Sequence, residues 1–245
     1  MEEAEDRSRS PSKYKAVMTP EGMSKRTHFT ADEVRSLQAL YKDSTLEGKM
    51  DRLRFREIIH TTFDITDDVM LDRIFRAFDT NNDALVDETE WMLGLSIFLL
   101  GSLDEHINFA YFCYDINGDR SLAREELYHC LKNCLIRTSG IEEDVEESVK
   151  EIVEIAMRKL DTDRNGQITF PDFQAAVIGD PLLLEACGPC LPTPKAVAAF
   201  FIQLKTKYQP QGGGNSSRRQ QNQGTVLSRR RRMRRSSSFN PIITD

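Results

Sequence analysis

The sequence lacks an apolar run long enough to cross a membrane, because its longest candidate, Trp91–Leu100, is shorter than the ~18–20 residues that a span needs. Its amino terminus, MEEAEDRSRS, is acidic, which predicts neither a secretory signal nor a transit peptide. The five Cys are an odd number without such a signal, which indicates free thiols in a reducing compartment. No Gly-rich phosphate loop or G-x-S-x-G elbow occurs, so catalysis has no candidate residues. We therefore expect a soluble cytoplasmic protein that is not an enzyme and has no membrane anchor.

Acidic residues are scarce at the carboxyl end of the chain. Residues 218–245 hold eight Arg and one Asp, a net charge of +7, which leaves −13 for residues 1–217 out of the total of −6. The Gly/Gln/Ser-rich stretch before this tail cannot bury a core, so we expect residues 209–245 to be a disordered linker and Arg-rich tail. Such a tail could bind acidic surfaces or act as a nuclear signal, but a solvated tail is the simpler interpretation, and we expect no nucleic-acid partner. Residues 1–27 are polar without an apolar period, and we predict that they are disordered as well.

Three twelve-residue segments share one pattern and begin at Asp79, Asp115 and Asp161. Each carries acidic or amide residues at alternate positions, a β-branched residue or Leu at the eighth position, and a carboxylate at the twelfth. Each follows an apolar helix face, namely Leu71, Ile74, Phe75 and Phe78; Ile107, Ala110, Tyr111 and Tyr114; Val153, Ala156, Met157 and Leu160. Helix, twelve-residue loop and helix together make an EF-hand, so the sequence predicts an all-α fold.

Calcium takes about six to eight oxygen ligands, which an EF-hand loop supplies from positions 1, 3, 5, 7, 9 and 12. The first loop offers Asp79, Asn81, Asp83, the Leu85 carbonyl, Asp87 and Glu90. The second loop offers Asp115, Asn117, Asp119, the Ser121 carbonyl, a water near Ala123, and Glu126. The third loop offers Asp161, Asp163, Asn165, the Gln167 carbonyl, Thr169 and Asp172. Simple acidic turns would not repeat this spacing three times between helices, so we predict three calcium sites. At position 8, Val86, Leu122 and Ile168 would form the short strands that couple paired loops.

Each loop departs from the usual pattern at one position. Position 6 turns with a positive φ and is normally Gly, as at Gly166, but Ala84 and Arg120 replace it in the first two loops. A cost of ~1 kcal/mol there weakens binding roughly fivefold without abolishing it. In the third loop, Asp172 is one methylene shorter than Glu, so we expect Mg²⁺ to compete better at this site.

Because EF-hands pack in pairs, three loops imply a fourth, degenerate hand in residues 29–63. Aligning Leu53 with position 8 puts Glu57 at position 12 and Leu46 at position 1, so this hand has lost its ligands. We expect residues 28–103 to form the first EF-hand pair, with the degenerate hand supporting loop 79–90. Residues 104–208 would form the second pair, with loops 115–126 and 161–172, a C-terminal helix, and an exposed link over residues 138–148.

The C-terminal segment 195–208 is amphipathic, and packing on the second pair is favoured over a free partner-binding helix. Cys187-Gly-Pro-Cys190 has the letters of a thioredoxin site but not its strand and helix context, so we expect no redox catalysis. Cys130 and Cys134, one helical turn apart, are expected to be ordinary thiols rather than zinc ligands.

The segments FDITDDVMLDRIFRAFD, EWMLGLSIFLLGSLDEHINFAYFCYDINGD and LLLEACGPCLP closely resemble the calaxin family, ciliary EF-hand proteins associated with outer-arm dynein. The resemblance runs from about residue 28 to residue 195 and implies a calcium sensor of motile cilia or flagella, acting at the axoneme on outer-arm dynein or its docking complex. The family is similar to the neuronal calcium sensors, but a myristoylated sensor needs Gly at position 2, where this chain has Glu2. Two alternatives stay open: a constitutive structural subunit of the axoneme, and a calcineurin B-like or neuronal calcium sensor-like regulator of an enzyme.

Overall fold

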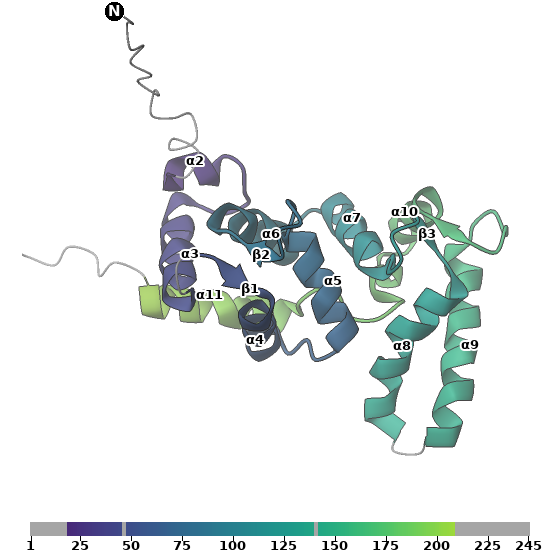
Figure 1. Cartoon of the computed structure of the whole chain (residues 1–245). Helices are drawn as coiled ribbons and strands as arrows, with labels where there is room; N and C mark the ends of the chain where they lie inside the picture. Colours follow the sequence, from purple (N-terminus) through teal and green to yellow (C-terminus); the bar gives the residue numbers. More distant parts are fainter. Residues whose placement is uncertain (1–18, 46–47, 140–141, 209–245) are drawn as a thin grey trace, which may run out of the picture. The chain divides into compact units, whose positions relative to one another are not determined.

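The computed structural model describes residues 19–45, 48–139 and 142–208, with the backbone alone for 133–139 and 142–145 (Figure 1). The predictions for residues 1–18 and 209–245 lie outside these ranges. Helices dominate the described residues, and the strands among them are two residues long. The all-α prediction is therefore confirmed.

The first EF-hand pair contains two helix–strand–helix units. Helix α3 (Ala31–Ser44), strand β1 (Met50–Asp51) and helix α4 (Arg52–Phe63) form one unit, and α5 (Asp68–Phe78), β2 (Leu85–Val86) and α6 (Glu88–Leu100) form the other. The strands pair antiparallel, with Met50 opposite Val86. The first unit is thus joined by its strand to the unit that holds the loop beginning at Asp79.

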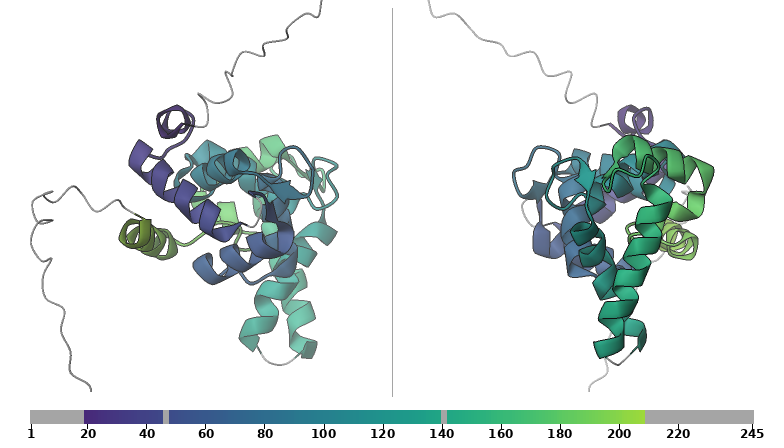
Figure 2. Two further views of the ribbon diagram at one scale, coloured as in Figure 1. Left: turned by 60° about the vertical axis from the view of Figure 1, so that its left-hand side comes forward. Right: turned by 90° about the vertical axis from the view of Figure 1, so that its right-hand side faces the viewer.

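The second EF-hand pair repeats this plan. Its first unit is α7 (Leu103–Tyr114), β3 (Ser121–Leu122) and α8 (Arg124–Ser139), and its second is α9 (Glu142–Leu160), β4 (Ile168–Thr169) and α10 (Phe170–Gly179). Leu122 lies opposite Ile168 in the antiparallel pair. Helices α8 and α9 run side by side as a helical hairpin (Figures 1 and 2). The exposed link expected over residues 138–148 is wrong, since α8 continues to Ser139 and α9 begins at Glu142.

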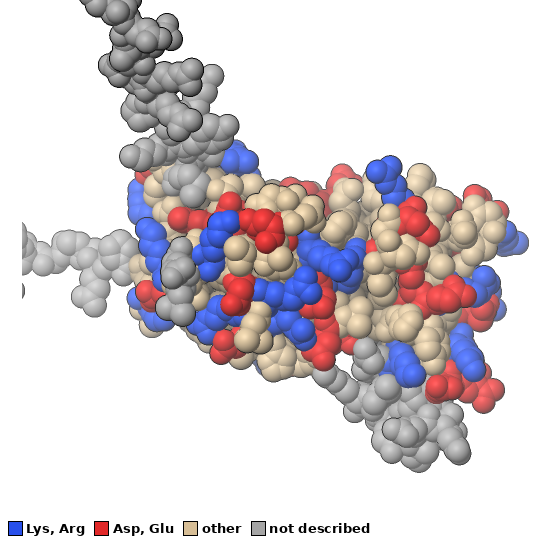
Figure 3. Space-filling view, in the orientation of Figure 1, with Lys and Arg blue, Asp and Glu red and all other residues tan. Residues whose placement is uncertain are grey.

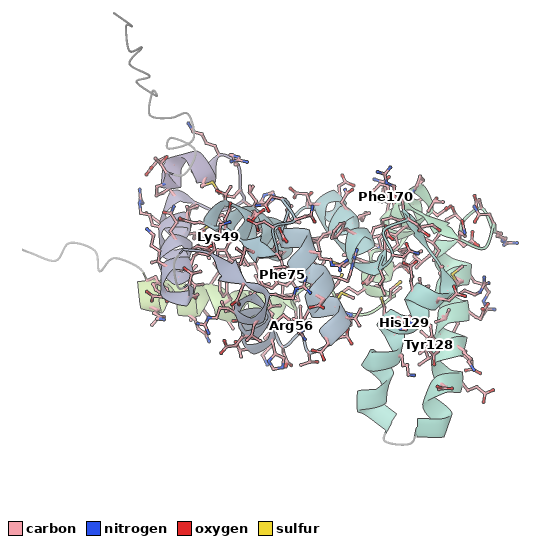
Figure 4. The ribbon with its side chains drawn as sticks, in the orientation of Figure 1. Lys49, Arg56, Phe75, Tyr128, His129 and Phe170 are labelled. Atoms are coloured by element: carbon pink, nitrogen blue, oxygen red, sulfur yellow. The ribbon has the colours of Figure 1, made fainter. Side chains whose placement is uncertain are left out.

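The predicted apolar helix faces form the core. Phe55 in α4 packs edge-on against Phe75 and Phe78 of α5, with ring centroids 5.3 and 4.9 Å apart. Tyr111 of α7 packs in the same way against Phe170, at 5.3 Å. Phe75 and Phe170 are labelled in Figure 4, one in each EF-hand pair. Aromatic side chains bury large areas, and they join the helices of each hand to those of its partner.

The amino-terminal prediction is wrong for its last part. Helix α2 (Pro20–Ser24) begins at the N-cap Thr19, whose side chain accepts a hydrogen bond from the Gly22 amide. Met23 is buried, and α2 packs against α3. The apolar contact of one Met was too small a signal to stand out among the polar residues of 1–27.

The C-terminal helix α11 (Pro194–Tyr208) packs on α3 and α4, so its expected place on the second EF-hand pair is wrong. Phe200 contacts Phe63 with ring centroids 5.4 Å apart, and Phe201 contacts Phe29 at 6.3 Å. The Tyr208 hydroxyl donates to the Asp43 carboxylate at 2.8 Å. Between α10 and α11, the short 3₁₀ helix η1 (Pro181–Glu185) contacts both α7 and α10. The chain thus returns from the second pair to cover the first (Figure 2).

Candidate calcium-binding loops

Position 8 holds the two loops of each pair together. Val86, Leu122 and Ile168 are fully buried, and each lies in the short strand that pairs with the neighbouring loop. A buried β-branched residue or Leu at this position fixes the register, because a slip of one residue would turn it to solvent. The prediction that these three residues couple paired loops is confirmed.

The acidic residue at position 1 organises the first half of each loop. Asp79 accepts hydrogen bonds from the Asp83 and Ala84 amides at 3.1 and 2.9 Å. In the other two loops the position 6 amides donate in the same way, Arg120 to Asp115 at 3.1 Å and Gly166 to Asp161 at 2.9 Å. The three carboxylates at position 1, which are predicted ligands, therefore accept hydrogen bonds from the backbones of their own loops.

Positions 3 and 5 form successive turns in which a side-chain oxygen accepts from the amide two residues later. In the first loop Asn81 accepts from Asp83 at 2.8 Å, and Asp83 accepts from Leu85 at 3.0 Å. The same bonds join Asn117 to Asp119 and Asp119 to Ser121 in the second loop, and Asp163 to Asn165 and Asn165 to Gln167 in the third. These turns curl the chain so that oxygen-bearing side chains alternate along it.

The carboxylate at position 12 ties the start of each loop to the start of the next helix. Glu90 accepts from the amides of Asn81 and Asp87 at 3.2 and 2.9 Å, and Asp87 caps α6 by accepting from the Glu90 amide. Glu126 accepts from Asn117 and Ala123 at 3.0 and 2.9 Å. Both glutamates are buried. Buried carboxylates need such donors. In both loops these hydrogen bonds join the carboxylate at position 12 to the backbone of positions 3 and 9.

Asp172 closes the third loop and accepts hydrogen bonds from two threonine hydroxyls. Its two oxygens accept from the hydroxyls of Thr162 and Thr169, and one also accepts from the Thr169 amide at 3.2 Å. These hydrogen bonds, with the Thr162 hydroxyl contributing most, hold the pKa of Asp172 below its ordinary value. In the first loop the Thr80 hydroxyl also donates to Glu90, at 3.0 Å.

Position 6 has a positive φ in all three loops, at 63° for Ala84, 69° for Arg120 and 89° for Gly166. The prediction of this left-handed turn is confirmed, and two of the three residues adopt it against the preference of their side chains.

The donor set suits a hard cation. Each loop carries carboxylate and amide oxygens at positions 1, 3, 5 and 12, which is the ligand chemistry that Ca²⁺ prefers over nitrogen or sulfur. Among the residues that the structure describes, no three His, Cys, Asp or Glu side chains meet in a group that could hold a metal ion. The assignment of individual ligands therefore stays a prediction.

The register assumed for the degenerate hand is wrong by three residues. Strand pairing puts Met50, not Leu53, at position 8, and Leu53 is 79% exposed. Gly48, with a φ of 80°, then takes position 6 and Arg54 takes position 12. The Arg54 guanidinium donates to the Ser44 carbonyl at 3.1 Å, where the other loops carry a closing carboxylate. The conclusion that this hand has lost its ligands is strengthened, because a cationic side chain stands at the closing position.

Lys49 of the degenerate hand reaches into the neighbouring loop, and sequence reasoning missed it. Its ammonium donates to the Asp83 carboxylate at 2.7 Å, and both groups lie at the surface. This hydrogen bond raises the pKa of Lys49 and lowers that of Asp83. Lys49 and Arg56 are labelled in Figure 4, and the space-filling view shows acidic and basic side chains intermixed over this pair (Figure 3). A predicted calcium ligand is thus already paired with a cation.

Two tyrosines hold the paired loops together in the same way. The Tyr41 hydroxyl lies 3.0 Å from the Gly48 carbonyl and 2.8 Å from the Val86 carbonyl, and it donates its one proton to this pair. The Tyr111 hydroxyl lies 2.7 Å from the Arg120 carbonyl and 3.2 Å from the Ile168 carbonyl. Burial raises the pKa of Tyr111 to about 12. In each pair, therefore, position 6 of one loop is bound to position 8 of the other.

The thiols of Cys187 and Cys190 are fully buried, and burial raises the pKa of Cys190 to about 12. The 3₁₀ helix η1 precedes them where a thioredoxin site has a strand. Cys130 is buried as well, whereas the side chain of Cys134 lies outside the described residues. These surroundings differ from those of a thioredoxin site, in which the reactive thiol is exposed and its pKa is lowered.

Comparison with known proteins places the loops in a family. Residues 104–178 match the model of an EF-hand domain pair. The Calaxin of Xenopus laevis is 46% identical over 189 residues, which cover 74% of this chain and 89% of that protein. The human Calaxin is 44% identical over 184 residues, covering 72% and 87% of the two chains. The calcineurin B protein of Candida glabrata is 30% identical over 154 residues, covering 62% and 83%.

None of the helices within the described ranges is both long and apolar enough to cross a membrane.

Proposed function

The chain belongs to the calaxin family of EF-hand proteins, and from this premise we propose that it is the calcium sensor of a motile cilium or flagellum, acting on outer-arm dynein or its docking complex. At the coarser level it is a calcium-binding EF-hand regulatory protein. The observation that carries the proposal is a hydrogen bond repeated in three loops of the same spacing, in which the position 6 amide donates to the carboxylate at position 1.

Bound calcium would supply a hard dication that gathers about six to eight oxygens into one shell. The residues that would hold it are the predicted sets at positions 1, 3, 5, 7, 9 and 12 of loops 79–90, 115–126 and 161–172. The affinity expected of such sensor loops is in the micromolar range. At loop 161–172 the shorter Asp172 favours competition by Mg²⁺, which accepts a smaller and stricter shell.

The second EF-hand pair is the better candidate for the switch, because both of its loops keep a closing carboxylate. Glu126 lies in the first turn of α8, and its amide and carboxylate bonds connect that helix to loop 115–126. Leu127 and Leu131 follow on the same helix and are buried. A shift of Glu126 into the loop moves α8 and uncovers these side chains, which creates a surface for an amphipathic partner segment.

The first pair should respond less. Its degenerate hand carries Arg54 at the closing position, and α11 already covers α3 and α4. Partner binding that depends on calcium is therefore assigned to the second pair. The main alternative is a structural subunit that binds the axoneme at every calcium concentration. The similarity to a calcineurin B protein favours a third function, the regulation of an enzyme through the same helices.

Capture from ciliary extract tests the proposal. The tagged full chain is incubated with extract in calcium or in chelator, and bound dynein chains and docking-complex subunits are measured. We expect capture to rise with calcium for wild type and for Glu125→Gln, whose exposed side chain neighbours Glu126, but not for Glu126→Gln. Equal capture in both conditions by all three proteins would favour the structural subunit. Capture of an enzyme without dynein would favour the calcineurin B-like alternative.

A further inference from the structure

A buried arginine of the first EF-hand pair holds the start of a calcium loop in the second pair. Arg73 lies in the middle of α5 and is only 6% exposed. Its guanidinium donates to four backbone carbonyls at the end of α7, those of Phe112, Cys113, Asp115 and Ile116. The Nε–Cys113 and Nη1–Ile116 distances are 3.2 and 3.3 Å. Arg is rarely buried without such partners.

The chemistry of a helix end explains this arrangement. The last carbonyls of a helix have no partner within it and carry partial negative charge. Arg73 brings a positive charge and a planar fork of donors to that end, and the fork reaches several carbonyls at once. The guanidinium carbon also lies 4.9 Å from the centre of the Phe112 ring, which adds a cation–π contact. One side chain thereby fixes both the last turn of α7 and the two residues that follow it.

The first of those residues is Asp115, position 1 of loop 115–126. Its backbone is held by Arg73, and its carboxylate accepts from the amides of Gly118 and Arg120 at 2.8 and 3.1 Å. Two sets of contacts therefore set the direction of this predicted calcium ligand. The loop amides hold its carboxylate, and Arg73, which belongs to the other EF-hand pair, holds its backbone carbonyl. We propose that Arg73 is a positioning residue for calcium at loop 115–126, an inference that rests on the proposed calcium binding of this loop.

The amides at position 6 allow each loop to be followed separately. Those of Ala84, Arg120 and Gly166 each donate to the first ligand of their own loop, so their ¹⁵N NMR signals report calcium at that loop. Calcium is titrated into the full chain, with Arg73→Met compared with wild type. Met keeps much of the apolar stem and removes every donor. The Arg120 signal should shift at about tenfold higher calcium in Arg73→Met, while the midpoint for Ala84 changes less than twofold.

Two further variants sharpen the test. Arg76→Met removes an exposed Arg from the same helix and should leave the Arg120 midpoint unchanged. Arg73→Lys keeps the charge but not the fork, so it should weaken calcium at loop 115–126 by an intermediate factor, and it replaces Arg73→Met if that variant does not fold. Hydrogen exchange of the ion-free protein gives a second readout, in which the Ile116 and Asn117 amides should exchange faster in Arg73→Met.

The failures of the two proposals can be told apart. If no position 6 amide of the wild type responds to calcium, the calcium-binding proposal fails. If the wild type responds but the Arg120 midpoint is the same in Arg73→Met, the role of Arg73 is overturned. Equal weakening at all three loops would also overturn it, because that result indicates a general loss of packing.

Discussion

At the scale of single residues, the calcium affinity of two loops should depend on the strained backbone turn at position 6. Ala84 and Arg120 hold a φ of 63° and 69°, which Gly adopts without cost. We predict that Ala84→Gly and Arg120→Gly each tighten calcium binding at their own loop by roughly fivefold, the equivalent of ~1 kcal/mol. Titration followed at the position 6 amide of each loop measures the change.

Gly166→Ala is the matched reverse control. A Cβ at Gly166 would have room, since it would lie 4.0 Å from a side-chain nitrogen of Arg124, so only the φ of 89° opposes the substitution. It should weaken loop 161–172 by about the same factor. If none of the three substitutions changes affinity, the turn at position 6 does not limit calcium binding.

Lys49 gives a second prediction at this scale. Because its ammonium is paired with Asp83, a cation at loop 79–90 must compete with it. Lys49→Met should therefore tighten calcium binding at this loop, by less than about tenfold because exposed charges are screened. The gain should shrink as salt is added, and Lys42→Met on the exposed side of α3 is the control. A salt-independent gain, or one shared by Lys42→Met, would contradict the ion-pair explanation.

The sequence predicted position 8 and the positive φ at position 6 well, because both follow from fixed spacing within one loop. It could not predict Lys49 or Arg73, since neither residue acts within its own loop. Lys49 reaches Asp83 only because two strands pair, and Arg73 reaches Asp115 only because α5 packs on α7. Such contacts are properties of the assembled fold.

At the scale of elements, the corrected register of the degenerate hand can be tested by a matched pair of substitutions. Met50 is buried opposite Val86, whereas Leu53 is exposed. Met50→Ala should lower the free energy of unfolding by about 2–5 kcal/mol, and Leu53→Ala should change it by less than about 0.5 kcal/mol. Urea unfolding measures both, and the opposite order would restore the register that places Leu53 at position 8.

The sequence did contain a signal for the correct register. Asp43 and Gly48 stand five residues apart, as at positions 1 and 6 of an EF-hand loop, and Asp51 caps α4 as Asp87 caps α6. This signal was hard to recognise because Asp43 does not begin a loop, since α3 continues through it to Ser44. Only residues 45–48 then precede position 7, against residues 79–84 in the next loop, which is two residues fewer. Positions 1 and 2 of the degenerate loop, residues 43 and 44, therefore belong to helix α3.

Helix α11 yields a further prediction for an element. Phe200 is buried against Phe63, while Ile202 on the same helix is 67% exposed. Phe200→Ala should lower the free energy of unfolding by about 3 kcal/mol or more, and Ile202→Ala should have little effect. Hydrogen exchange should also rise in α3 and α4 of Phe200→Ala but not in α9. Faster exchange confined to the second pair would contradict the position of α11.

At the scale of the whole molecule, the sequence predicted two EF-hand pairs but not which of them the C-terminal helix packs on. The amphipathic pattern of residues 195–208 shows that a helix must be covered, without showing by what. The structure places it on the first pair, whereas the second pair holds two predicted calcium loops and the helix that carries Glu126. This return of the chain is why we assign the proposed calcium switch to the second pair rather than to the first.

The central claim is that the chain binds calcium as a sensor does, and calorimetric titration of the full chain tests it most directly. At physiological magnesium we predict at least one site of micromolar affinity, with part of the heat lost in Glu126→Gln and retained in Glu125→Gln. A flat trace for the wild type at physiological magnesium would contradict the account.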